Sequence, residues 1–317
     1  MSVFKLFPGI SNVSRLLLLI GLLILGTALS IGLAYLVTII FMGKDVLLDP
    51  NIMLNIGFIR IMQILNQIGV FIMPPLALAF FTETHPGQYL GFNSVKGSHI
   101  IATLLLIFGM SPIVSFLMEL NEGMLLPQSF QSIEDWMRSS EDKANELVQW
   151  MLSYTDPLSL GINALMIILL PAIGEELLFR AVLIRIFKGI FKNIHLAVWI
   201  SAILFSAFHL QFYGFLPRMF LGLAFGYLFI WSGTIWVPVM AHFINNATVV
   251  AVTYLNSNGI ITQSPDEFGH VDSPLLIVFS IIMTAVVCVF LYLTRRSYLL
   301  FPVSGYSDES QNSELNA

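Results

Sequence analysis

The sequence has few charged residues and almost no cysteine. Only 10% of its 317 residues are charged, whereas soluble globular proteins carry about 25%. The net charge of −5 comes from 14 basic and 19 acidic residues, so a basic face for nucleic acid is not expected. The single cysteine, Cys288, excludes a disulfide framework and a cysteine-rich metal cluster. A His-Glu-x-x-His zinc motif is also missing.

Apolar side chains take the place of the missing charges. Hydrophobic residues make up 57% of the chain, with 26 phenylalanines, and the mean hydropathy is +0.85. A soluble protein cannot hide this much apolar surface, because polar groups must still cover its exterior. The composition therefore predicts an all-α, polytopic integral membrane protein.

Long apolar runs divide the chain into expected membrane spans. A spanning helix needs about 20 mostly apolar residues, and runs of about this kind occur eight times. We expect helices at 16–41, 56–81, 100–117, 158–187, 196–210, 217–231, 236–255 and 274–293. The Pro74-Pro75 pair predicts a kink in the second of them.

The basic residues predict the orientation of these spans. Cytoplasmic loops are enriched in lysine and arginine, and a cytoplasmic N-terminus places most of the loop lysines and arginines inside. The expected inner set is Lys5, Arg15, Lys96, Arg185, Lys188, Lys192, Arg295 and Arg296, against Lys44, Arg138 and Lys143 outside. Eight spans return the C-terminus to the same side. We therefore expect a multi-pass cell-membrane protein with both termini cytoplasmic.

The organisation along the chain follows from these spans. We expect N-terminal helices and an extracytoplasmic connection over 1–157, a motif-bearing core over 158–256, a last loop and helix over 257–303, and a disordered tail over 304–317. Within the connection, 132–151 has apolar residues at nearly helical spacing. This pattern predicts an amphipathic helix between spans three and four, which either lies on the membrane surface or covers a buried site.

Three ionisable residues lie deep in the fourth span. Glu175, Glu176 and Arg180 are flanked by apolar runs, and Glu175 precedes Lys188 by 13 residues, or roughly 20 Å of helix. A charge at this depth costs several kcal/mol, so its presence indicates function. Glu176 and Arg180 are four residues apart and can pair on one helix face. Glu175 points elsewhere and is free to exchange protons. We therefore predict a catalytic Glu175 and a structural Glu176.

Two histidines lie within later spans. His209 ends a Phe205-x-x-x-His pattern, and His242 begins a His-x-x-x-Asn pattern that ends at Asn246. A single buried histidine is usually a packing residue. Two of them, with an acidic pair on a third helix, favour a shared polar site.

These motifs resemble the CAAX prenyl endopeptidase and bacteriocin-processing family of intramembrane proteases. The resemblance rests on Glu-Glu-x-x-x-Arg, Phe-x-x-x-His and His-x-x-x-Asn, each on its own helix and in this order, and it covers about 158–255. It implies an endopeptidase that hydrolyses a peptide bond near or within the membrane. By this resemblance Glu175 and His209 activate a water molecule, His242 and Asn246 stabilise the oxyanion, and Glu176 and Arg180 orient the acid.

Metal dependence and two other functions stay open at this stage. Glu175, His209 and His242 with a water would suit catalytic zinc, whereas an oxyanion role for Asn246 favours a site without metal. A proton-coupled transporter also buries such groups, but the inverted repeats typical of transporters are not recognisable. A non-catalytic membrane scaffold is the other alternative. The expected partners are the lipid bilayer and a peptide or protein substrate.

Overall fold

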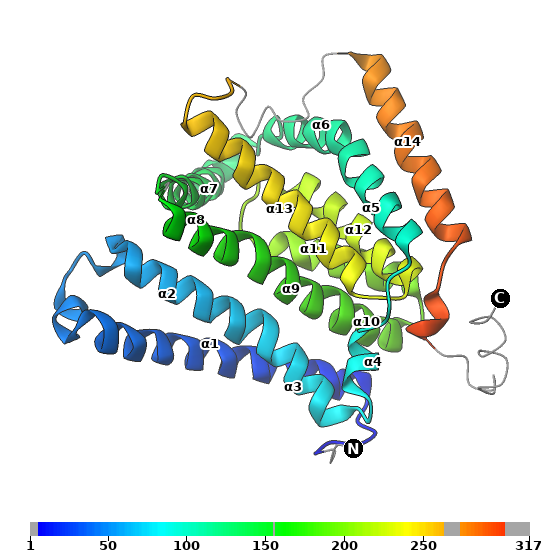
Figure 1. The fold of residues 1–317 in the computed structure, drawn as a ribbon, viewed down its shortest axis with the longest axis horizontal. Helices are drawn as coiled ribbons and strands as arrows, with labels where there is room; N and C mark the ends of the chain where they lie inside the picture. Colours follow the sequence, from blue (N-terminus) through cyan, green and yellow to red (C-terminus); the bar gives the residue numbers. More distant parts are fainter. Residues whose placement is uncertain (1–5, 155, 263–272, 302–317) are drawn as a thin grey trace.

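The computed structural model describes residues 6–154, 156–262 and 273–301. Every regular element in these ranges is helical, so the all-α prediction is confirmed (Figure 1). The expected tail at 304–317 lies outside the described residues.

The helices follow the apolar runs closely. The chain begins with α1 (Asn12–Met42) and the short turns η1 (Lys44–Leu48) and η2 (Ile52–Leu54). The second run forms α2 (Ile56–Asn66), η3 (Gln67–Ile72) and α3 (Met73–Thr82), and α4 (Pro86–Leu90) precedes α5 (Gly97–Gly109) and α6 (Ser111–Glu122). The connection holds η4 (Gln128–Phe130) and α7 (Gln131–Leu152). The fourth run comprises α8 (Pro157–Asn163), η5 (Ala164–Leu169), α9 (Leu170–Glu175), η6 (Glu176–Leu183) and α10 (Ile184–Phe191). It is followed by α11 (Ile194–Ala207), α12 (Phe215–Ser232), α13 (Trp236–Ser257), α14 (Pro274–Leu293) and η7 (Ser297–Leu299).

Six of the helical segments are long and apolar enough to cross a membrane. They are Asn12–Met42, Ile56–Thr82, Gly97–Glu122, Pro157–Phe191, Phe215–Ser232 and Pro274–Leu293. The two other expected spans are helical as well: α11 has only 14 residues, and α13 carries His242, Asn245 and Asn246. The protein is thus an integral membrane protein, and the count of eight crossings stays a prediction.

Helix ends that we expect on the cytoplasmic side meet at one end of the bundle. The Ile235 amide donates to the Gly91 carbonyl (2.9 Å), which joins the α12–α13 turn to α4. The Arg296 amide donates to the Trp231 carbonyl, which joins the end of α14 to the same turn. In Figure 1 these ends lie together with the start of α1. The chain therefore alternates in direction as the orientation prediction requires, and the side that faces the cytoplasm stays a prediction.

Prolines coincide with breaks in the regular α-helical pattern. The π-helical segment η3 ends just before Pro74 and Pro75, and η5 ends two residues before Pro171. Proline lacks the backbone N–H that would bond the carbonyl four residues earlier, so the helix must adjust locally. A π-helical segment thus precedes Pro74-Pro75, and the kink expected there stays a prediction. A further π-helical segment, η6, holds Glu176 and Arg180.

The small-residue pair Gly222 and Gly226 lets α12 pack closely against α11. A Cβ atom on Gly226 would lie 2.8 Å from Val198 Cγ1, and one on Gly222 would lie 3.1 Å from the Ala202 backbone. Close approach of this kind is the usual role of small-xxx-small pairs in membrane helices. The contact holds α12 beside the helix that leads to His209.

We expect Gly226→Val to destabilise the protein by about 1–3 kcal/mol, because the added carbons overpack the α11–α12 contact. Gly21→Val is the control, since a Cβ atom at Gly21 meets nothing within 4 Å. Thermal unfolding of the two purified variants in detergent measures the difference. Equal unfolding temperatures would show that α11 and α12 do not depend on this close contact.

Candidate active site

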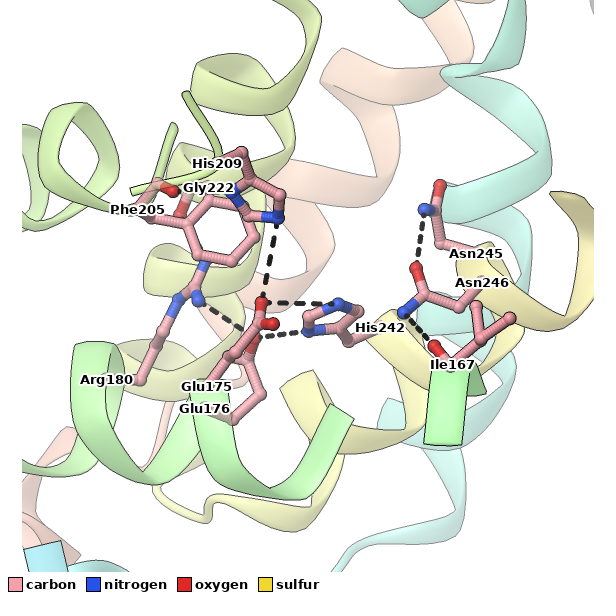
Figure 2. A network of polar contacts seen from close by, with 10 residues as sticks. All are labelled: Ile167, Glu175, Glu176, Arg180, Phe205, His209, Gly222, His242, Asn245 and Asn246. Carbon is pink, nitrogen blue, oxygen red and sulfur yellow. Dashed lines mark hydrogen bonds and ion pairs between the residues drawn. The ribbon is translucent and has the colours of Figure 1, made fainter. Parts of the chain in front are cut away.

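The six predicted site residues come from three parts of the chain. Glu175 ends α9, Glu176 and Arg180 lie in η6, His209 follows α11, and His242 and Asn246 lie on α13. Figure 2 shows five of them around one point, with Asn246 further along α13.

Glu176 and Arg180 form a fully buried ion pair. Arg180 Nη1 lies 2.9 Å from Glu176 Oε1, and the two side chains are 1% and 0% exposed. Arg180 Nη2 also donates to the Gly222 carbonyl (3.3 Å) on α12, and its guanidinium lies 4.3 Å from the centre of the Phe205 ring. The predicted i,i+4 pairing is therefore present in the structure, and it gives the buried Glu176 carboxylate a cationic partner.

The same carboxylate oxygen of Glu176 also binds His242. His242 Nδ1 lies 2.8 Å from Glu176 Oε1, and the His242 ring stacks on Phe225 of α12 with ring centres 5.3 Å apart. An ionised carboxylate only accepts hydrogen bonds, so Nδ1 carries the hydrogen and Nε2 of a neutral ring is left as an acceptor. Glu176 thus orients His242. The family resemblance implies a different role for Glu176, namely to orient the catalytic acid Glu175.

His209 is held by the backbone of its own motif. Its Nδ1 lies 2.8 Å from the Phe205 carbonyl oxygen, which can only accept, so Nε2 is again the free acceptor of a neutral ring. α11 ends at Ala207, and Leu210 has a left-handed φ of 53°, which is uncommon for a residue other than glycine. The chain therefore leaves the helical path of α11 directly after His209.

Both histidines turn Nε2 toward the carboxylate of Glu175. Glu175 Oε2 lies 4.0 Å from His209 Nε2 and 3.9 Å from His242 Nε2, as Figure 2 shows. The oxygen is buried and has no hydrogen-bond partner among the described residues. Three atoms with free electron pairs therefore converge from three parts of the chain.

Asn246 binds a backbone carbonyl. Its Nδ2 donates to the Ile167 carbonyl (3.2 Å), and its Oδ1 accepts from Asn245 Nδ2 (3.3 Å). In a regular α-helix the Ile167 carbonyl would accept from residue 171, but Pro171 has no N–H to donate. Asn246 therefore satisfies a carbonyl that proline exposes within the membrane. One hydrogen of its amide group is left for another partner.

The converging atoms line a cavity of about 830 Å³. Glu175, His209 and His242 line it, and so does Asn246. Polar side chains from α2, α6 and η3 contribute as well, namely Gln63, Gln67, Ser111 and Ser115. The cavity therefore brings polar groups, which a wet site inside a membrane protein requires, together with apolar side chains such as Ile107 and Phe108.

Helix α7 covers part of this cavity. Its Arg138, Glu141 and Asn145 line the same space as Glu175. Glu141 Oε2 accepts from the Tyr213 amide (2.7 Å), and Gln211 donates to Asn145 (3.2 Å). These bonds attach α7 to the loop that follows His209. Of the two interpretations from sequence, the structure favours a helix that covers a buried site.

Sequence reasoning missed several residues of the site. Phe225 and Arg218 on α12 both line the cavity, and Arg218 Nη1 donates to the Gln211 carbonyl (2.9 Å) in the loop after His209. An arginine near the start of an apolar run was a usable signal for Arg218. A phenylalanine among 26 carries no comparable signal, so Phe225 emerges only from the fold.

The three converging side chains do not fit a tetrahedral zinc ion as they stand. Zinc bonds of about 2.0–2.2 Å would hold neighbouring donor atoms about 3.4 Å apart, whereas Glu175 Oε2 lies 3.9 and 4.0 Å from the two nitrogen atoms. Within the part of the chain that the structure describes, no group of three His, Cys, Asp or Glu side chains is placed to hold a metal ion.

Together, the helical fold and the buried Glu/His cluster define an integral membrane protein with a polar site inside the bundle. Comparison with known proteins finds a similarity in this segment: residues 157–248 match a family model described as type II CAAX prenyl endopeptidase Rce1-like. The resemblance found in the motifs is thus confirmed for that segment, which contains all six predicted site residues.

One curated relative is similar over a shorter region. The chain is 31% identical over 83 residues to YpbD of Bacillus subtilis strain 168, an uncharacterized protein. The aligned region is 25% of this chain and covers 39% of the relative's length. No solved structure matches the chain significantly.

Proposed function

We propose that the protein is an intramembrane endopeptidase that hydrolyses a peptide bond in the cavity between α9, α13 and α7. The observation that carries this proposal is the convergence of Glu175 Oε2, His209 Nε2 and His242 Nε2. Two acceptors about 4 Å apart can both accept hydrogen bonds of about 2.8 Å from one water molecule. The family match over 157–248 supports the same class of reaction.

The proposed reaction begins with the activation of water. Glu175 takes a proton from a water molecule that His209 also binds, and the resulting hydroxide attacks the carbonyl carbon of the peptide bond. The C–N bond breaks as the proton passes to the leaving nitrogen. The products are a free carboxyl end and a free amine, so one water is consumed for each bond.

The negative charge on the carbonyl oxygen needs hydrogen-bond donors. The second amide hydrogen of Asn246 is one, since Ile167 engages only the other. His242 becomes a donor at Nε2 once it holds a proton there, because Glu176 already binds Nδ1. A single well-aimed donor contributes about 3–4 kcal/mol to such a step.

The cavity also limits what the substrate can be. The described lining combines polar groups near α7 with apolar side chains such as Ile107, Phe108 and Val249. An extended segment of a membrane-associated peptide would find partners for its backbone and for its apolar side chains there. We propose this substrate class, together with a cell-membrane location and cytoplasmic termini.

Comparative peptidomics tests the proposed function. Membranes containing the protein should release peptides that become about 100-fold or more scarcer with His209→Ala, because a part of the water-activating group is lost. His195→Ala is the matched control, since His195 is exposed, hydrogen-bonds Tyr227 and does not line the cavity. Identical peptide sets from all three membranes would favour the scaffold or transporter alternative.

The same preparation tests the role of metal. Purified protein whose metal content has been measured should keep cleaving after a chelator is added, because the site geometry suits a water molecule better than zinc. Loss of activity on chelation, with recovery when zinc is returned, would instead make Glu175, His209 and His242 ligands that move closer around the ion.

A further inference from the structure

A second, smaller pocket lies at the end of the bundle that we expect to face the cytoplasm. Its volume is about 390 Å³, and it is lined by residues of α4 and α10 and by Phe301 after η7. Three of its six lining residues are cationic, namely Arg185, Lys188 and Lys192. Among the residues that the structure describes, none that lines this pocket is acidic.

Arg185 has donors that no neighbour uses. Its Nη1 donates to the Leu300 carbonyl, but Nε and Nη2 are buried and without a hydrogen-bond partner among the described residues. Buried polar atoms are nearly always paired in native proteins, so such donors call for an explanation. The guanidinium is fixed in place by the rings of Tyr89 and Phe301, whose centres lie 5.1 and 5.2 Å away.

In the described part of the chain, no carboxylate forms a salt bridge with Arg185, Lys188 or Lys192. Glu83 is the acid whose charge reaches Arg185, and it is already paired with Arg15 at 2.6 Å. In the described ranges, neither Lys188 nor Lys192 forms a salt bridge. Lys188 Nζ instead lies 3.5 Å from the centre of the Phe301 ring. The pocket therefore holds three positive charges and has unused donors.

We propose that this pocket binds the phosphate group of an anionic ligand, supplied by a membrane lipid headgroup or by free phosphate. A planar guanidinium with two free N–H groups on one edge suits phosphate oxygens. The half-buried Lys188 and the exposed Lys192 add charge at the mouth. Basic pockets between membrane helices on the cytoplasmic side are typical sites for anionic lipid headgroups.

The alternative is that these cations are solvated and only add to the positive charge of the expected cytoplasmic side, without binding a ligand. In that case, anion binding would weaken equally whichever two exposed positive charges on this side are removed. Lys96→Gln with Arg295→Gln provides that comparison, because both residues are exposed and neither lines the pocket. Lys188→Gln with Lys192→Gln removes the same charge from the pocket and leaves the partly buried Arg185 in place.

The test measures ligand binding by the full-length protein in a zwitterionic detergent. Native mass spectrometry and thermal unfolding are recorded with phosphatidylglycerol, with phosphatidylcholine of the same chains, and with inorganic phosphate. Wild-type protein and the Lys96/Arg295 variant should bind phosphatidylglycerol alike. The Lys188/Lys192 variant should bind it about 30-fold more weakly, since two basic residues at about 1 kcal/mol each are lost.

The three ligands separate the sources of the anion. Tight binding of phosphatidylglycerol alone assigns the pocket to a lipid headgroup, and binding of inorganic phosphate that is lost in the Lys188/Lys192 variant assigns it to free phosphate. The proposal is wrong if neither anion binds more tightly than phosphatidylcholine, or if both double variants lose binding equally.

Discussion

Glu175→Gln is expected to lower the rate of peptide cleavage by about 10²–10⁴-fold while the fold stays intact. Glutamine keeps the shape of the side chain but cannot take a proton from water. The structure predicts little effect on stability, because Glu175 Oε2 has no hydrogen-bond partner among the described residues. Cleavage by the purified variant in lipid vesicles, with thermal unfolding as a check on folding, measures both properties.

A second carboxylate in the same cavity controls for the loss of charge. Asp142 also lines the cavity but is exposed on α7, so Asp142→Asn should keep activity close to that of the wild type. If Glu175→Gln retains more than about a tenth of wild-type activity, Glu175 is not the general base. Equal losses in both variants would point to the charge of the cavity rather than to proton transfer.

Arg180→Met is expected to destabilise the protein by about 3–5 kcal/mol. It leaves Glu176, which is 0% exposed, as a buried charge without its cation. Chemical unfolding in detergent micelles measures the loss. The double variant with Glu176→Gln should recover part of it, because no uncompensated charge then stays buried.

The chain contains a second i,i+4 ion pair of the same length, in which the arginine is exposed and the glutamate is buried. Arg138 and Glu134 are also four residues apart and also lie 2.9 Å from each other, but the Arg138 side chain is 45% exposed. Arg138→Met should therefore cost about 1 kcal/mol or less. Similar losses for Arg138→Met and Arg180→Met would mean that the burial of the Arg180 pair has no energetic consequence.

Much of the secondary structure could be predicted from the sequence. Each of the eight apolar runs is helical in the structure, because hydropathy and helix formation depend on neighbours along the chain. The Glu176–Arg180 pair was predictable for the same reason, since one helical turn brings its members together.

The assignment of partners across helices was less predictable. Sequence spacing could not show that Glu176 holds His242, because the two residues are 66 positions apart in the chain. It could not show that Asn246 binds the Ile167 carbonyl beside Pro171, nor that α7 covers the cavity. Each of these depends on how helices pack, and apolar surfaces pack without encoding which polar atoms will meet.

The sequence by itself determined that this is a membrane protein and indicated the residues that we propose as its site, because composition and charge inside apolar runs are local properties of the chain. Only the tertiary structure decided which of these residues act on one another. Whether a hydrogen bond forms depends on differences of a few tenths of an ångström in the donor–acceptor distance. Those distances are set when separate helices come together.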